Sequence, residues 1–125
     1  MLIMAASVGV ALLAGLAVVQ VLLAAGAPLG RFAWGGQHVV LPAGLRVGSA
    51  VSVAVYAAVA VVLLDRAEVV DVLPDGLVHV LAWVLTGYFT LGTAMNAVSR
   101  SRPERLVMTP VALALAVVCL LLALG

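Results

Sequence analysis

The run LIMAASVGVALLAGLAVVQVLLAAG, residues 2–26, contains no charged residue, and Ser7 and Gln20 are its only polar side chains. A helix needs about 20 apolar residues to cross the roughly 30 Å hydrocarbon core of a bilayer, so this run is long enough to span a membrane. It is also longer than the apolar core of about 7–15 residues in a secretory signal, and no basic residue precedes it. We therefore expect a retained membrane-spanning helix.

Three further apolar runs follow, over residues 47–64, 77–98 and 106–124, and all eleven charged residues lie between the runs. Inside a bilayer every backbone amide must be satisfied by the chain itself, which favours helices over open strands. The 125 residues therefore predict a single membrane domain, residues 1–125. Its fold class is all-α: a polytopic membrane protein forming an up-and-down four-transmembrane-helix bundle, with spans at about 2–26, 47–64, 77–98 and 103–124.

Local signals predict the starts of the last two helices. The turn at residues 74–76 precedes the third run, and Asp75 is expected to cap that helix. Ser101 and Glu104 have the spacing of a capping box, in which Glu104 reaches back to the Ser101 amide. A helix that begins there contains Pro110, which removes one backbone hydrogen bond and bends the helix. The alternative start at Pro110 leaves about 15 residues, too few to span comfortably.

The arginines are divided unevenly between the two sides of the membrane. Five of the six lie in residues 27–46 and 99–105, whereas residues 65–76 contain only Arg66. The positive-inside rule therefore places the connections 27–46 and 99–105 in the cytoplasm and both termini outside. A composition without lysine and rich in Ala, Val, Gly and Arg is typical of GC-rich bacteria, so we expect a bacterial plasma membrane.

The first connection has an unusual composition for a loop. The segment GAPLGRFAWGGQHVVLPAG, residues 26–44, combines two prolines and five glycines with Phe32 and Trp34. Aromatic side chains beside an arginine suit the headgroup region of a bilayer. We expect a folded interfacial segment, broken at Gly35 and Gly36, that is neither a free linker nor a helix.

Uncharged polar residues gather in the half of the bundle nearest the first and third connections, at Gln20, Ser49, Ser52, Thr93 and Asn96. Amides in hydrocarbon need partners, so Gln20 and Asn96 should face the interior and bond each other, the serines, Thr93, a backbone carbonyl or water. One interpretation is purely structural, because such bonds commonly join membrane helices. The other is a polar vestibule for an anionic ligand or lipid headgroup. Its candidate binding residues are Gln20, Ser52, Asn96, Arg46, Arg100, Arg102 and Arg105.

The acidic connection offers a second, weaker pattern. Asp65, Glu68 and Asp71 recur at three-residue spacing, and His79 follows near the start of the third run. Such oxygen ligands could hold a divalent cation, but the spacing matches no defined site, and a solvated acidic turn is the commoner interpretation. We therefore expect no metal and no cofactor. The only cysteine, Cys119, excludes an internal disulfide or a CxxC redox centre.

Two segments, GAPLGRFAWGGQHVVLPAGLRVGS (residues 26–49) and MNAVSRSRPERLVMTPVALAL (residues 95–115), resemble an uncharacterised family of small four-span bacterial integral membrane proteins. The resemblance implies the same architecture and transfers no activity or site residue.

The absence of charge within the spans argues against ion-driven transport, which places carboxylates or histidines there. We therefore expect a non-enzymatic interaction or accessory protein of the membrane. Its partners would be the lipid bilayer and another copy or another membrane protein, with no nucleic acid. The alternative is a small channel or carrier for an uncharged or anionic solute, with its polar vestibule on the cytoplasmic side.

Overall fold

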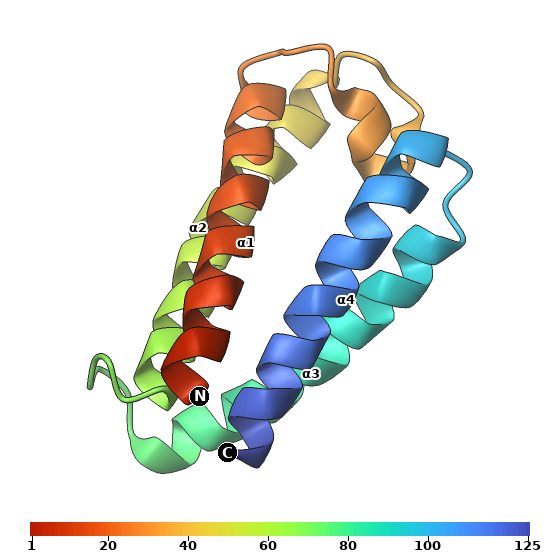
Figure 1. The fold of residues 1–125 in the computed structure, drawn as a ribbon. Coiled ribbons are helices and arrows are strands. Elements are labelled where there is room, and N and C mark those ends of the chain that lie inside the picture. Colours follow the sequence, from red (N-terminus) through yellow and green to blue (C-terminus); the bar gives the residue numbers. More distant parts are fainter.

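The computed structural model describes all 125 residues and confirms an all-helical chain (Figure 1). Its four long helices are α1 (Leu2–Ala24), α2 (Ala43–Arg66), α3 (Asp75–Ala97) and α4 (Arg102–Leu124). Each is long and apolar enough to cross a membrane, so the chain is a multi-pass membrane protein with a four-helix bundle.

The helices form two antiparallel hairpins. α1 packs along α2, and α3 packs along α4 (Figure 1). The hairpins meet mainly where α1 touches α4, whereas α2 and α3 make less contact with each other. The α2–α3 side is therefore the loosest seam of the bundle.

The tightest packing lies in the half of the bundle that carries the termini. Ala6, Leu63, Cys119 and Leu122 are completely buried there. Gly9 lets α1 approach its neighbours closely, because a Cβ at this position would lie 2.7 Å from Leu63 Cδ1. Close packing of this kind holds helices together in lipid, where the hydrophobic effect does not act between them.

Helix boundaries lie close to the predicted ones, with informative differences. α1 ends at Ala24, two residues early, and Gly26 follows with a φ of +94°, as expected of the glycine that commonly ends a helix. α2 begins four residues early, directly after Pro42. The prediction that Asp75 caps α3 is wrong: Pro74 is the N-cap residue, and Asp75 is the first helical residue. Its negative charge there still suits the positive end of the helix dipole.

α4 begins after Ser101 and continues through Pro110 without interruption, as predicted. The predicted capping box is wrong. The Ser101 hydroxyl donates a hydrogen bond to the Arg31 carbonyl, and Glu104 accepts one from the Gly35 amide at 3.1 Å. Both side chains bind the first connection instead of their own helix, because that segment folds directly over the start of α4.

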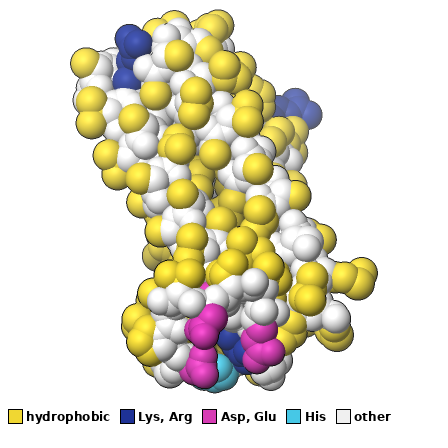
Figure 2. Space-filling model, turned by 90° about the vertical axis from the view of Figure 1, so that its left-hand side faces the viewer, with side chains coloured by type: hydrophobic (Ala, Val, Ile, Leu, Met, Phe, Trp, Pro, Cys, Tyr) yellow, Lys and Arg dark blue, Asp and Glu magenta, His cyan; other side chains and the backbone are white.

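The charged side chains occupy the two ends of the molecule (Figure 2). Acidic side chains, a histidine and Arg66 gather at the end that carries the termini, and the other five arginines lie at the opposite end. Apolar side chains cover the band between them, with Val8, Val55 and Leu113 among those exposed. This surface suits a bilayer, whose acyl chains would surround the band.

Candidate ligand-binding site

Loop one, residues 25–42, folds into a compact cap over one end of the bundle. It contains two short 3₁₀ helices, η1 (Gly30–Phe32) and η2 (Trp34–Gly36). Gly35 and Gly36 have φ angles of +76° and +69°, which favour glycine. A folded segment interrupted at this glycine pair was predicted, whereas the two 3₁₀ turns were not.

Trp34 fixes this cap to α2. Its indole N–H donates a hydrogen bond to the Ser49 hydroxyl at 3.1 Å. Its ring lies against Gly48, where a Cβ would come within 2.9 Å of the Trp34 Cζ2 atom. Trp34 itself has a φ of +53°, which is uncommon for a residue other than glycine. These contacts with Gly48 and Ser49 fix the position of the Trp34 ring against α2.

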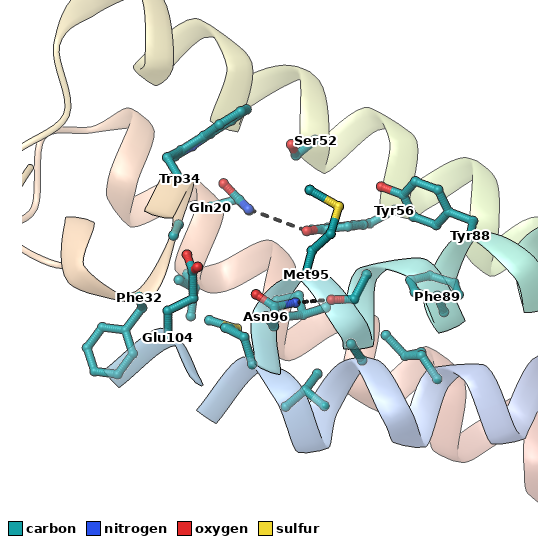
Figure 3. Close-up of a pocket in the computed structure, with 18 of the residues that line it drawn as sticks. Gln20, Phe32, Trp34, Ser52, Tyr56, Tyr88, Phe89, Met95, Asn96 and Glu104 are labelled. Atoms are coloured by element: carbon teal, nitrogen blue, oxygen red, sulfur yellow. Dashed lines mark hydrogen bonds between the residues drawn. The ribbon is translucent and has the colours of Figure 1, made fainter. Parts of the chain in front are cut away.

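Beneath the cap lies a cavity, which we call the inner hollow, of about 310 Å³ (Figure 3). Fourteen of its 19 lining residues are hydrophobic, and they come from all four helices and loop one. Tyr56, at its deep end, lies thirteen residues into α2, roughly 20 Å along the axis at about 1.5 Å per residue. The inner hollow therefore reaches about the middle of the bundle.

A second cavity, which we call the outer hollow, opens where loop one meets loop three (residues 98–101). Its volume is about 680 Å³, and only two of its 12 lining residues are hydrophobic. The two hollows share five lining residues: Trp34, Gly92, Met95, Asn96 and Glu104. The two hollows therefore adjoin along these residues, with a polar hollow at the end of the bundle and an apolar one within it.

The structure brings together three of the predicted binding residues. Gln20, Ser52 and Asn96 all line the inner hollow (Figure 3). Gln20 and Asn96 do not bond each other or the serines: Asn96 bonds a backbone carbonyl, which was among the expected partners, and Gln20 bonds a tyrosine, which was not. Gln20 Nε2 is 3.4 Å from the Tyr56 hydroxyl, and Asn96 Nδ2 donates to the Gly92 carbonyl at 2.8 Å. The hollow separates α1 from α3, so each amide finds a nearer partner.

Gln20 also carries an unsatisfied group. Its Oε1 atom is buried and has no hydrogen-bond partner. A buried amide oxygen without a partner costs roughly 1–3 kcal/mol.

The four predicted rim arginines divide into two groups. Arg46 donates to the Ala24 carbonyl at 2.9 Å, and Arg105 donates to the Ser99 carbonyl at 3.1 Å. These two side chains therefore stabilise helix ends and turns. Arg102 is exposed and lines neither hollow, so only Arg100 takes its predicted place at the mouth.

Several lining residues were not predicted as site residues. Arg31 lines the outer hollow, as Arg100 does, and neither guanidinium group has a hydrogen-bond partner within the chain. Glu104, which is only 7% exposed, lies where the two hollows join. Glu104 follows Ser101 by three residues, a spacing that is typical of a helix cap. The sequence therefore predicted a local role and not the contact of Glu104 with loop one. Trp34 was recognised only as an interfacial aromatic residue.

The acidic end of the molecule forms no comparable site. Asp65 is only 6% exposed and accepts hydrogen bonds from the Val72 and Leu73 amides, both at 2.8 Å. Its carboxylate therefore organises loop two (residues 67–74). No group of three potential ligands is close enough to hold a metal ion, so the alternative of a cation site at Asp65, Glu68 and Asp71 has no geometric support.

Comparison with protein-family models, curated proteins and solved structures gave no match to this chain. The resemblance to small four-span bacterial membrane proteins therefore stays a prediction, and the site has to be interpreted from its own geometry.

Proposed function

We propose that this protein is a small, non-enzymatic membrane protein that binds a ligand in the joined hollows under loop one. The supporting observation is that a polar hollow at the end of the bundle adjoins an apolar one at Asn96, and that the apolar hollow is lined as far in as Gln20 and Tyr56. If the polar residues form a vestibule, Asn96 should border an open cavity. If they only join helices, Asn96 should be packed between them. Its position at the junction of two open cavities favours the vestibule.

The shape of the cavity favours binding over conduction. Below the inner hollow, Ala6, Leu63, Cys119 and Leu122 are completely buried in the packed core. A channel needs a continuous path between both faces of the membrane, and the packed core lies across such a path. The ligand would therefore enter and leave at the same end, or sideways between helices.

We place the mouth on the cytoplasmic side of a bacterial plasma membrane, because five of the six arginines lie at that end. Self-association or a membrane-protein partner stays a prediction, and it is compatible with a ligand in the hollow.

Mass spectrometry of the protein purified in a mild detergent tests the proposal. A non-covalently bound molecule should accompany the wild-type chain. Gly92→Leu should abolish this binding, because Gly92 lines both hollows and a Cβ there meets no atom within 4 Å. The larger side chain would therefore fill the junction without displacing the helices.

Gly87→Leu is the matched control. Gly87 lies on the same helix, has the same free space and lines neither hollow. It should retain the bound molecule. A wild-type protein that carries no ligand, or a Gly92→Leu variant that retains it in full, would refute the proposed function.

A further inference from the structure

We infer that the ligand is a membrane lipid with an anionic phosphate headgroup, of which phosphatidylglycerol is the type to test. The phosphate would bind Arg31 and Arg100 at the outer hollow, and one acyl chain would lie in the inner hollow. This inference rests on the proposed function and specifies the chemical class of its ligand.

The division of polarity between the two hollows supports an amphiphile. A small soluble anion would use only the outer hollow, where ten of the 12 lining residues are not hydrophobic. An apolar solute would use only the inner hollow, where fourteen of 19 are hydrophobic. A molecule with a polar head and an apolar tail matches both of the adjoining hollows.

The size of the inner hollow and its position favour one chain of a lipid. Its volume of about 310 Å³ is at the lower end of the range of roughly 300–1,000 Å³ for small-molecule pockets. A complete two-chain lipid does not fit, so the second chain must leave through an opening. The loosely packed α2–α3 seam provides one, because Tyr88, Leu91 and Met95 line the inner hollow and are 56%, 61% and 63% exposed. In a bilayer this seam faces the acyl chains.

The charges at the mouth select the headgroup. The guanidinium groups of Arg31 and Arg100 are exposed and unpartnered, and guanidinium matches phosphate through paired, charge-assisted hydrogen bonds. Deeper in, the Glu104 carboxylate repels a bare anion and accepts hydrogen bonds from hydroxyl groups. The phosphate would therefore remain at the arginines, and the acyl chain, which carries no charge, can pass Glu104 into the inner hollow.

Arginines at a membrane boundary also set topology, and that role alone would explain their presence. Arg102 separates the two explanations. It belongs to the same basic cluster as Arg100 and is exposed, but it lines neither hollow. A nonspecific surface charge effect would involve Arg102 equally, whereas a specific headgroup site would not.

The test is a titration of the delipidated full chain in detergent, with native mass spectrometry to count bound molecules. The three probes are phosphatidylglycerol, phosphatidylcholine with the same acyl chains, and glycerol 3-phosphate. We expect one tightly bound phosphatidylglycerol, with a Kd about tenfold below that of phosphatidylcholine: both lipids offer the same phosphate, but choline adds a positive charge that Arg31 and Arg100 repel, whereas the glycerol headgroup is neutral. Glycerol 3-phosphate, which lacks acyl chains, should bind much more weakly than the lipid.

The combined variant Arg31→Gln, Arg100→Gln should lose the preference for phosphatidylglycerol, and Arg102→Gln should keep it. Both mutated arginines lack partners in the chain, so the variants should fold. Equal Kd values for the two lipids, an equal loss in Arg102→Gln, or glycerol 3-phosphate binding as tight as the lipid would each overturn the inference. If a molecule bound to the wild type is displaced by Gly92→Leu while the two lipids bind equally, the proposed function stands and the lipid assignment falls.

Discussion

The Glu104 carboxylate accepts a hydrogen bond from the Gly35 amide at 3.1 Å, and this contact connects residues 69 positions apart in the sequence. It joins the first turn of α4 to loop one directly over the outer hollow. A buried carboxylate therefore helps to hold the cap on α4, beside the Trp34 contacts that fix it to α2.

This contact predicts that Glu104→Ala destabilises the protein by about 1.5–3 kcal/mol, the range for hydrogen bonds to charged groups. The Gly35 amide would lose its partner, and loop one would loosen. Glu104→Gln keeps an acceptor oxygen and should cost less. Thermal unfolding in detergent measures both effects, and equal stability of Glu104→Ala and the wild type would show that the contact does not hold the cap.

The close contact between Trp34 and Gly48 makes a second prediction. In Gly48→Ala, the new Cβ would lie 2.9 Å from the indole ring, so the ring must move and its hydrogen bond to Ser49 should weaken. We expect a red-shifted Trp34 emission, measured in a Trp83→Phe background so that only Trp34 reports. Gly44→Ala on the same helix meets no atom within 4 Å and should leave the emission unchanged. A shift in both variants would mean that Trp34 does not depend on this contact.

The helices could be predicted from the sequence because hydrocarbon allows few alternatives. A long uncharged run has to be a helix there, and the charged residues mark its ends. The N-cap position of Ser101 was found from a local pattern, whereas the turn expected at residues 74–76 is wrong, because α3 already begins at Asp75. The apolar runs therefore give the elements and their order, and local patterns give the helix ends less reliably.

The site was less predictable, because it depends on contacts between distant segments. The sequence places Gln20 and Asn96 at similar depth, but it does not reveal that a cavity separates them. The pattern around Ser101 indicates a local cap, and only the folded loop one shows that both capping side chains have another partner. The roles of Arg31 and Arg100 likewise follow from where loop one and loop three meet.

The helix contact at Gly9 should be important for stability. A Cβ there would lie 2.7 Å from Leu63 Cδ1 and 2.9 Å from Val118 Cγ1. We expect Gly9→Val to destabilise the bundle by about 1–3 kcal/mol, as overpacked cores do. Gly15→Val on the same helix meets no atom within 4 Å and is the matched control for the change in helix propensity. Similar melting temperatures for the two variants would contradict the close approach of α1.

The proposed threading can be tested with single cysteines in a Cys119→Ala background. Ser101 is partly buried and bonded to Arg31, so the exposed Arg102 is the better position at that end. In intact cells, Arg102→Cys should resist a membrane-impermeant thiol reagent, and Asp71→Cys in the exposed part of loop two should react. Both should react once the cells are opened. If only Arg102→Cys reacted in intact cells, the orientation of the protein in the membrane would be the opposite of the one proposed.

Substitution of Asn96 can separate a role in ligand binding from a role in stabilising the bundle. Its side-chain amide donates only to the Gly92 carbonyl of its own helix, and it lies where the two hollows join. Hydrogen bonds between membrane helices average only about 0.6 kcal/mol, and this one joins no second helix, so Asn96→Leu should change the melting temperature little. The same change places an apolar side chain at the polar mouth and should weaken phosphatidylglycerol binding severalfold in the native mass spectrometry titration. A variant that melts much earlier yet binds the lipid normally when folded would assign Asn96 to structural support.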